Sequence, residues 1–463
     1  MSDVTPSIGG APAPPPYVSI CVLSYDADQA TLPALLDSII CRPRGSAAEE
    51  IVIYWSGTGD GPASLVGYPV PDGVALRIVT GPWKADDPAN GEPFAWARQR
   101  AFEAARVVWR GYLDSDDVLG VAGDKATDGA LRRAGTSAAA TDHGLTLADY
   151  LRDLAPEVNG VCLPYVYRQD VAGNVEQTNW RARFVRWADG WVWKAPVHED
   201  MYPLPGNVAR PVYNAGLVGV HGPTKPDMER VERNLAILTK LHAQMGDQTD
   251  SRTLFGIGSA YLDRGDATRS RDFFARALMT SPSSEDAWIT HRLLARACLI
   301  DGAPDAALHH ALMALATLPD RPDSFLSVGE VLIRQGRHGA AITFMEMGFA
   351  KVQAAVFLMD EPAFRHGFMR AGLAECYIVV GRLDDAVRTA EEAAKASNHP
   401  YPATILRVAR ERQRRARLTG AIQMLVQSAV EVGDIATAKA HLAACPIEIE
   451  GTVSEVLPNT TFR

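Results

Sequence analysis

The second half of the sequence combines helical spacing of apolar residues with glycines that recur at regular intervals. Gly265, Gly302 and Gly336 are separated by 37 and 34 residues, and Pro282 and Pro319 are again 37 residues apart. Such a period indicates paired helices, with glycine at the turn inside each pair and proline at its end. A helical pair of this kind buries its apolar face only by stacking on its neighbours. We therefore predict an all-α solenoid in this half of the chain.

The segment 254–282 shows the repeated unit best, with small residues where the two helices would touch. It resembles the tetratricopeptide repeat, whose period is roughly 34 residues. Two further turn glycines, Gly381 and Gly433, follow at longer intervals of 45 and 52 residues, so we expect an irregular array of four or five units. The predicted repeat domain covers residues 228–450.

The first half of the sequence alternates short β-branched runs with segments of helical spacing. This alternation predicts an α/β domain over residues 17–227, built on a doubly wound parallel sheet with helices on both faces. Ligands bind such sheets at the carboxyl ends of the strands. The predicted strands are residues 17–25, 50–54, 74–79, 110–114, 161–168 and 217–220, and the predicted helices are residues 28–40 and 94–108.

Three segments lack these patterns. Residues 1–16 are rich in proline and lack the regions of a signal peptide, so we expect a disordered leader. Residues 121–147 are small, polar and aperiodic, which predicts a mobile excursion, and residues 451–463 form a tail. No apolar run approaches the roughly 20 residues of a membrane span. The six cysteines are scattered singly, as in a reducing compartment, so we expect a cytoplasmic protein.

The net charge of −9 argues against a protein that mainly holds nucleic acid. The acidic excess lies in residues 1–225, with 19 Lys and Arg against 26 Asp and Glu, and favours a bound cation or a cationic partner there. A nucleic-acid acceptor stays a minor alternative because six arginines lie within eleven residues of one predicted helix. These are Arg407, Arg410, Arg412, Arg414, Arg415 and Arg417.

Asp114, Asp116 and Asp117 directly follow a predicted strand. Two aspartates one residue apart can hold Mg²⁺ or Mn²⁺, which bridges a nucleotide diphosphate and stabilises it as a leaving group. The same triplet can be an acidic loop that caps a helix. It also fits the nucleophile motif of haloacid-dehalogenase-like phosphatases, but that family carries the motif on its first strand, and three strands come earlier here.

Several short motifs occur in a fixed order along some 220 residues of the first half. Together they resemble the family-two glycosyltransferases of the GT-A fold, in particular the branch with C-terminal tetratricopeptide-like helices, which includes enzymes that glycosylate peptides. The motifs are VSICVLSY at 18–25, EIVIYWSGTGD at 50–60, FAWARQ at 94–99, YLDSDD at 112–117, RF at 183–184, VHE at 197–199, His221 and ERNLAIL at 232–238.

The resemblance implies a divalent cation, Mn²⁺ or Mg²⁺, that holds the diphosphate of a UDP- or GDP-linked sugar. It assigns this cation to Asp116 together with Asp114, and makes His221 a further candidate ligand. Arg98 is expected to contact the diphosphate or to order the aspartates, although a surface salt bridge is an alternative. The candidate donor-binding residues are Asp114, Asp116, Arg98, Tyr25, Trp55 and Asp60.

On the acceptor side, inverting sugar transfer needs a carboxylate that takes the proton of the attacking group. The resemblance favours Glu199 for this role, with Asp200 second, and a helix N-cap is the alternative. Trp191, Trp193 and His198 lie nearby in the sequence and are a predicted acceptor platform, unless the tryptophans are core residues.

The sequence departs from the family where the second predicted strand ends. Trp55 and Ser56 occupy positions where aspartates are expected, and Gln99 replaces the usual Asn. Either Trp55 stacks on the base while Asp60 or Asp26 supplies the carboxylate, or donor binding has been lost.

The leading hypothesis is therefore a metal-dependent inverting glycosyltransferase with a protein or peptide acceptor, because tetratricopeptide arrays bind extended peptides. A non-catalytic protein-binding scaffold is the main alternative, and a homo-oligomer stays open.

Overall fold

The computed structural model describes residues 17–26, 29–40, 46–82, 93–121, 147–169, 175–195, 197, 199–213, 217–221, 227–280, 282–351, 360–432, 434, 436–437 and 440. These residues form two compact units. The first holds the described residues up to 164 together with 181–221, and the second holds 165–180 and the residues from 227 onward. The predicted leader, the predicted tail and nearly all of the predicted excursion lie outside the described residues.

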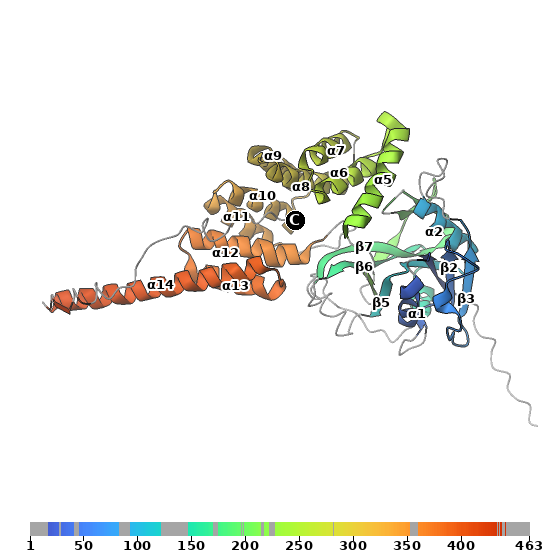
Figure 1. Cartoon of the computed structure of the whole chain (residues 1–463), viewed down its shortest axis with the longest axis horizontal. Helices are drawn as coiled ribbons and strands as arrows, with labels where there is room; N and C mark the ends of the chain where they lie inside the picture. Colours follow the sequence, from blue (N-terminus) through green and yellow to red (C-terminus); the bar gives the residue numbers. More distant parts are fainter. Residues whose placement is uncertain are drawn as a thin grey trace, which may run out of the picture. The chain divides into compact units, whose positions relative to one another are not determined.

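The first unit is built on a mixed sheet with strand order β3-β2-β1-β4-β7-β6-β11-β5, and β10 pairs with β6 (Figure 1). A separate ribbon pairs β8 with β9. The strands are β1 (Val18–Ser24), β2 (Glu50–Trp55), β3 (Ala75–Thr80), β4 (Trp109–Asp114), β5 (Asp117–Val121), β6 (Gly160–Gln169), β7 (Val175–Arg186), β8 (Trp191–Lys194), β9 (Asp200–Pro203), β10 (Pro211–Tyr213) and β11 (Leu217–His221).

Helices α1 (Leu32–Ile40) and α2 (Pro93–Ala104) cover opposite faces of the β1 to β4 part of the sheet. Successive side chains of a strand point to opposite faces. Accordingly, Ile20 of β1 packs in one core cluster with α1, whereas its neighbour Cys21 packs in another with α2. Strand β1 pairs in parallel with both β2 and β4, and β2 pairs in parallel with β3.

The strand pairings after β4 are mixed. β4 pairs antiparallel with β7, and β5 pairs antiparallel with β11, whereas β10 pairs in parallel with β6. A parallel crossover needs a dozen or more residues and usually a helix. Among the described residues after β4, the helix that precedes β11 is the six-residue α4 (Leu147–Arg152). The predicted parallel arrangement is therefore present from β1 to β4, and the sheet as a whole is mixed.

The second unit contains the predicted helical repeats as four consecutive helix pairs. Each pair turns in the same way, because the N–H that follows the turn glycine donates to the carbonyl five residues earlier. Examples are Asp266 to Tyr261 at 2.9 Å and Ala303 to Cys298 at 2.8 Å. The turn glycines have φ between 70° and 80°, which favours glycine over other residues. The pairs are α6 (Ser251–Asp263) with α7 (Ala267–Met279), α8 (Ser284–Ile300) with α9 (Pro304–Thr317), α10 (Pro322–Arg334) with α11 (His338–Phe349), and α12 (Arg370–Val379) with α13 (Leu383–Ala396).

Two further helices flank these pairs, α5 (Asp227–Met245) before them and the 32-residue α14 (Pro400–Glu431) after them. Gly433, the fifth predicted turn glycine, lies outside the described residues. None of the helices in the described ranges is both long enough and apolar enough to cross a membrane.

A buried ionic network lies among the first helices of the pairs. Arg365, in a π-helical segment just before α12, donates to both oxygens of Asp323 at 3.1 and 3.2 Å and to Asp360 at 2.7 Å. All three side chains are buried. Asp360 also exchanges two backbone hydrogen bonds of 2.8 Å with Thr178, in the part of β7 that belongs to this unit. This network joins α10 to the segment that precedes α12.

We expect Arg365→Met to destabilise the helical unit by about 3–5 kcal/mol, because it removes the cation bonded to two buried carboxylates and leaves Asp323 with the more distant Arg321, at 3.6 Å. The measurement is thermal unfolding followed by circular dichroism at 222 nm. Arg388→Met is the matched control, since Arg388 forms an exposed ion pair with Asp385 on α13, and such pairs contribute about 0–1 kcal/mol. Equal melting temperatures for the two variants would contradict the prediction.

Candidate functional site

The acidic triplet lies at the carboxyl end of β4, where the direction of strand addition changes. β2 and β4 flank β1 on opposite sides, and Leu23 at the end of β1 is in register with Asp114 at the end of β4. Chain connections leave such a point toward opposite sides of the sheet, which opens a crevice where ligands of α/β proteins bind. The acidic triplet therefore lies at the kind of position where α/β sheets bind ligands, at the carboxyl end of a parallel strand.

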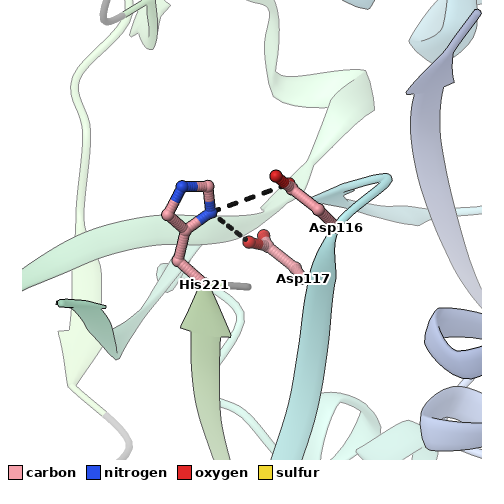
Figure 2. Close-up of side chains that lie close together, drawn as sticks. All are labelled: Asp116, Asp117 and His221. Carbon is pink, nitrogen blue, oxygen red and sulfur yellow. Dashed lines mark hydrogen bonds and ion pairs between the residues drawn. The ribbon is translucent and has the colours of Figure 1, made fainter. Parts of the chain in front are cut away.

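Asp116, Asp117 and His221 form a cluster at this edge (Figure 2). β5 begins at Asp117 and β11 ends at His221, and the antiparallel register pairs these two residues. His221 Nδ1 lies 3.3 Å from Asp117 Oδ1 and 3.6 Å from Asp116 Oδ1. One ligand atom from each residue lies within 4.8 Å of the other two. Asp116 and His221 therefore come together as the sequence predicts.

This donor set fits a divalent metal ion. Carboxylates suit Mg²⁺ and Mn²⁺, whereas an imidazole is a common ligand of transition-metal ions. Mg²⁺ sites are built almost wholly from oxygen. The mixed set of two carboxylates and one imidazole thus favours Mn²⁺ over Mg²⁺.

Protons relieve part of the negative charge of this cluster. Burial, with repulsion from Asp114 and Asp117, raises the pKa of Asp116 to about 6, although His221 acts in the opposite direction. Burial lowers the pKa of His221, but its hydrogen bond to Asp117 and the charge of Asp116 outweigh burial and raise that pKa overall. A metal ion therefore competes with protons for the same ligand atoms.

Asp117 was not among the sequence-predicted ligands, yet it holds the cluster together. Its side chain is fully buried. One oxygen faces His221, and the other accepts the backbone N–H of Asp114 at 2.9 Å and lies 3.7 Å from Arg183 Nη1. The signal in the sequence was its place in the triplet, but only the pairing of β5 with β11 shows that it faces His221.

Asp114 is held by Arg98 of α2, which donates to its carboxylate. Burial would raise the pKa of Asp114, but the charges of Arg98 and Arg183 outweigh it and lower that pKa to about 2. Asp117, rather than Asp114, lies with Asp116 and His221 in the cluster that could hold a metal ion. Arg98 is buried rather than part of a surface salt bridge, and it bonds to Asp114 of the acidic triplet.

Arg98 also contacts Glu199, the carboxylate predicted as the general base. Its Nε donates to Glu199 Oε1 at 2.6 Å, and the Glu199 side chain is 9% exposed. Asp200, the second candidate base, begins β9 and lies 3.4 Å from Arg181. Of the two predicted bases, Glu199 is the one linked to the acidic triplet.

The connection between β8 and β9, which carries Glu199, includes a strained residue. Among the described residues, Ala195 is the one non-glycine residue with positive φ, at 83°.

The predicted acceptor platform is core in this structure. Trp191 and Trp193 of β8 are 5% and 3% exposed. The Trp193 ring packs edge-on against Tyr112 and Phe102, with centroids 4.7 and 5.3 Å apart. Neither tryptophan therefore offers a face to an acceptor. His198, the third predicted member, lies outside the described residues.

The predicted nucleotide end is closed around Trp55. This side chain is 1% exposed, and its Nε1 donates to the Thr58 carbonyl at 3.2 Å. Asp26 accepts hydrogen bonds from the Thr58 N–H and hydroxyl at 3.0 and 2.9 Å. A Cβ atom at Gly57 would lie 2.3 Å from the Trp55 ring, so glycine is required for this close packing. Trp55 therefore presents no ring face to a base here.

The two other predicted donor-binding residues lie near this closed loop. Tyr25 follows β1 and is half-buried, and Asp60 is exposed in the loop after β2. Asp60 is therefore the predicted carboxylate that is open to a ligand, whereas Asp26 is committed to Thr58.

No protein-family model matches this chain, and no curated protein matches it. Solved structures of helical-repeat proteins are similar to its helical part. A chain of the APC/C hetero-tetramer Cut9-Hcn1 is 14% identical over 47% of this chain and 40% of that one, with a TM-score of 0.36.

Two smaller proteins are matched over most of their own length. YrrB, a TPR protein with an unusual peptide-binding site, is 15% identical over 38% of this chain and 82% of its own, with a TM-score of 0.30. TTC0263, a thermophilic TPR protein of Thermus thermophilus, is 17% identical over 40% of this chain and 93% of its own, also at 0.30. This chain spans less than half of the matched Cut9-Hcn1 chain.

We expect Asp116→Asn and His221→Ala each to weaken Mn²⁺ binding at least tenfold, because each removes one ligand from a three-residue set. Isothermal titration calorimetry with MnCl₂ measures the affinity. Asp60→Asn is the control, since this exposed aspartate lies outside the cluster. Unchanged affinity in both ligand variants would show that Mn²⁺ binds elsewhere.

We also expect the Mn²⁺ affinity to rise with pH between about 5 and 7.5. Below about pH 6 the Asp116 carboxyl is protonated, and a protonated His221 cannot bind metal, so protons displace the ion at low pH. Titrations in two buffers of different ionisation enthalpy would report proton release on binding. An affinity that does not depend on pH across this range contradicts the expectation.

Proposed function

We propose that this protein is a metal-dependent inverting glycosyltransferase that uses a nucleotide-sugar donor. The observation that carries the proposal is the placement of two carboxylates and an imidazole at the β4 end, with Glu199 linked to the same loop through Arg98. The GT-A resemblance of the sequence adds the type of reaction, and the parallel β1 to β4 arrangement is compatible with it.

In this proposal Asp116, Asp117 and His221 hold the cation. The cation would neutralise the diphosphate of the donor and stabilise it as the leaving group. Arg98 supplies a second positive charge beside the loop, in a buried setting where charge interactions are stronger than in water. Asp114, kept ionised by Arg98 and Arg183, stays an acceptor for a donor hydroxyl or a metal-bound water.

Glu199 is the proposed general base. Its Oε1 accepts from Arg98, which leaves Oε2 to take the proton of the acceptor. As the acceptor oxygen or nitrogen bonds to the anomeric carbon, its proton passes to Glu199, and the bond from that carbon to the phosphate oxygen breaks. The electron pair of the broken bond stays on the diphosphate. Attack from the face opposite the leaving group inverts the anomeric centre.

A polypeptide is the proposed acceptor, on the basis of the sequence resemblance. The inner helices α8 and α10 limit where it can bind, because they are buried on nearly every side and Asp360 already pairs with Thr178. An extended peptide therefore needs another surface of the helical unit than these two helices.

A non-catalytic scaffold is the second candidate, and the closed loop at Trp55 favours it. A base that cannot reach the end of β2 loses its usual contact, which would prevent donor binding. In that case the helical unit carries the function by binding a protein partner, as repeat arrays commonly do.

The basic run on α14 gives no comparable support to a nucleic-acid acceptor. Arg410 pairs with Glu391 at 2.8 Å, and Arg417 pairs with Asp384 at 3.3 Å, both on α13. Arg414 and Arg415 both pair with Glu411. Carboxylates of this chain thus already neutralise much of the run.

We expect Glu199→Gln to lower the turnover of a nucleotide sugar at least 100-fold, because the proton acceptor is lost, while Mn²⁺ and nucleotide still bind with affinities changed by less than about tenfold. Product release from a panel of UDP- and GDP-sugars in Mn²⁺ measures turnover, and thermal shift measures binding. Exposed Glu157→Gln is the control. The proposal fails if the wild-type chain neither turns over any donor nor binds UDP or GDP in a metal-dependent way.

A further inference from the structure

We propose that Arg98 couples the cation site to Glu199. Binding of a cation would then change the hydrogen bonding of Glu199, and a change at Glu199 would alter the affinity for the cation. This inference deepens the proposed function and rests on it for the role of Glu199. Arg98 bonds two carboxylates that lie 16 and 101 residues away in the sequence. Through them it joins the acidic loop to the connection between β8 and β9.

The guanidinium is held so that it cannot shift toward one carboxylate without changing its hydrogen bond to the other. It donates through Nη2 to Asp114 and through Nε to Glu199, and these donors belong to one rigid plane. The Tyr112 and Trp193 rings lie 4.7 and 5.3 Å from its central carbon. Side-chain exposure of 7% leaves little room for reorientation. Arg98 is therefore a positioning residue with two fixed partners.

The link continues from Asp114 into the metal cluster. The Asp114 N–H donates to Oδ2 of Asp117, whose Oδ1 faces His221. A cation that draws Asp117 toward itself thus acts on the Asp114 backbone, and the Asp114 side chain passes this effect on to Arg98. The contacts between residues in this path are hydrogen bonds to buried or partly buried groups.

A third donor of Arg98 supports a ligand-dependent role. Its Nη1 is buried and has no hydrogen-bond partner among the described residues. A buried donor without a partner costs free energy, and an anionic oxygen that enters the site would satisfy this one. A diphosphate oxygen at Nη1 would share the positive charge now divided between Asp114 and Glu199. Donor binding would then weaken the hydrogen bond from Arg98 to Glu199 and so link the diphosphate to this carboxylate.

Gln99 supports the same coupling from the neighbouring position. Its side-chain oxygen accepts the Trp193 backbone N–H at 3.2 Å, so α2 holds both β8 and the connection that follows it. The adjacent residues Arg98 and Gln99 of α2 therefore hold β8 and the connection after it, and Arg98 also holds the acidic loop.

The test is a double-mutant cycle on Mn²⁺ affinity, which needs no catalytic activity. Isothermal titration calorimetry would compare wild type, Glu199→Gln, Arg98→Lys and the double variant. Lysine keeps the positive charge but lacks the planar fork. We expect Glu199→Gln to change the Mn²⁺ Kd at least threefold in the wild-type background and less than about 1.5-fold in the Arg98→Lys background. Equal effects in the two backgrounds overturn the coupling.

Arg100→Lys is the matched control on the same helix, because Arg100 pairs with Glu103 in an exposed position. It should leave the effect of Glu199→Gln unchanged. If Arg98→Lys does not fold, Asp114→Asn breaks the same bridge from its other end and should uncouple Glu199 equally. A full Glu199 effect in that variant also overturns the inference.

An activity measurement separates this inference from the proposed function. We expect Arg98→Lys to lower kcat at least tenfold and also to raise the donor Kd in Mn²⁺, because lysine lacks the Nη1 donor. Coupling in the Mn²⁺ cycle without any turnover would refute the proposed function and retain the coupling. Turnover without coupling would refute the coupling and retain the proposed function.

Discussion

The Asp117 carboxylate joins three elements that lie far apart in the sequence. It accepts the backbone N–H that ends β4, faces His221 at the end of β11 and lies near Arg183 of β7. A buried carboxylate is costly unless such partners compensate it. The partners of Asp117 lie on β4, β11 and β7. The acidic loop can therefore form only when the mixed part of the sheet is in register.

The site that results is charged but internally balanced. Arg98 and Arg183 keep Asp114 ionised, and protons are retained more readily at Asp116 and His221. This division separates the roles of two aspartates that the sequence presents as equivalent. One is tied to a guanidinium that also holds Glu199, and the other is available to a cation. The end of β2, where the sequence predicted nucleotide contacts, is instead filled by the close packing of Trp55 against Gly57.

The helical unit shows a related balance between charge and packing. Its four turns use the same backbone hydrogen bond, so the array is regular where it is defined by local geometry. Arg365, Asp323 and Asp360 instead form a buried ionic network whose charges compensate one another. Buried groups of this kind, with Asp360 also paired to Thr178, offer no open face to a peptide, and the proposed acceptor surface must be sought elsewhere.

The sequence by itself determined the elements whose signals are local. Glycines at the turns predicted the helix pairs, since a positive φ is a property of one residue, and alternating buried runs predicted β1 to β4. The acidic triplet was recognised as a candidate site from its place after a predicted strand, and His221 was added to it through the family resemblance. Only the tertiary structure decided which side chains meet. The register of β5 with β11 placed Asp117 opposite His221, burial turned Trp191, Trp193 and Trp55 into core residues, and α2 brought Arg98 between Asp114 and Glu199. These are contacts over tens of residues, and no periodicity within a single segment encodes them.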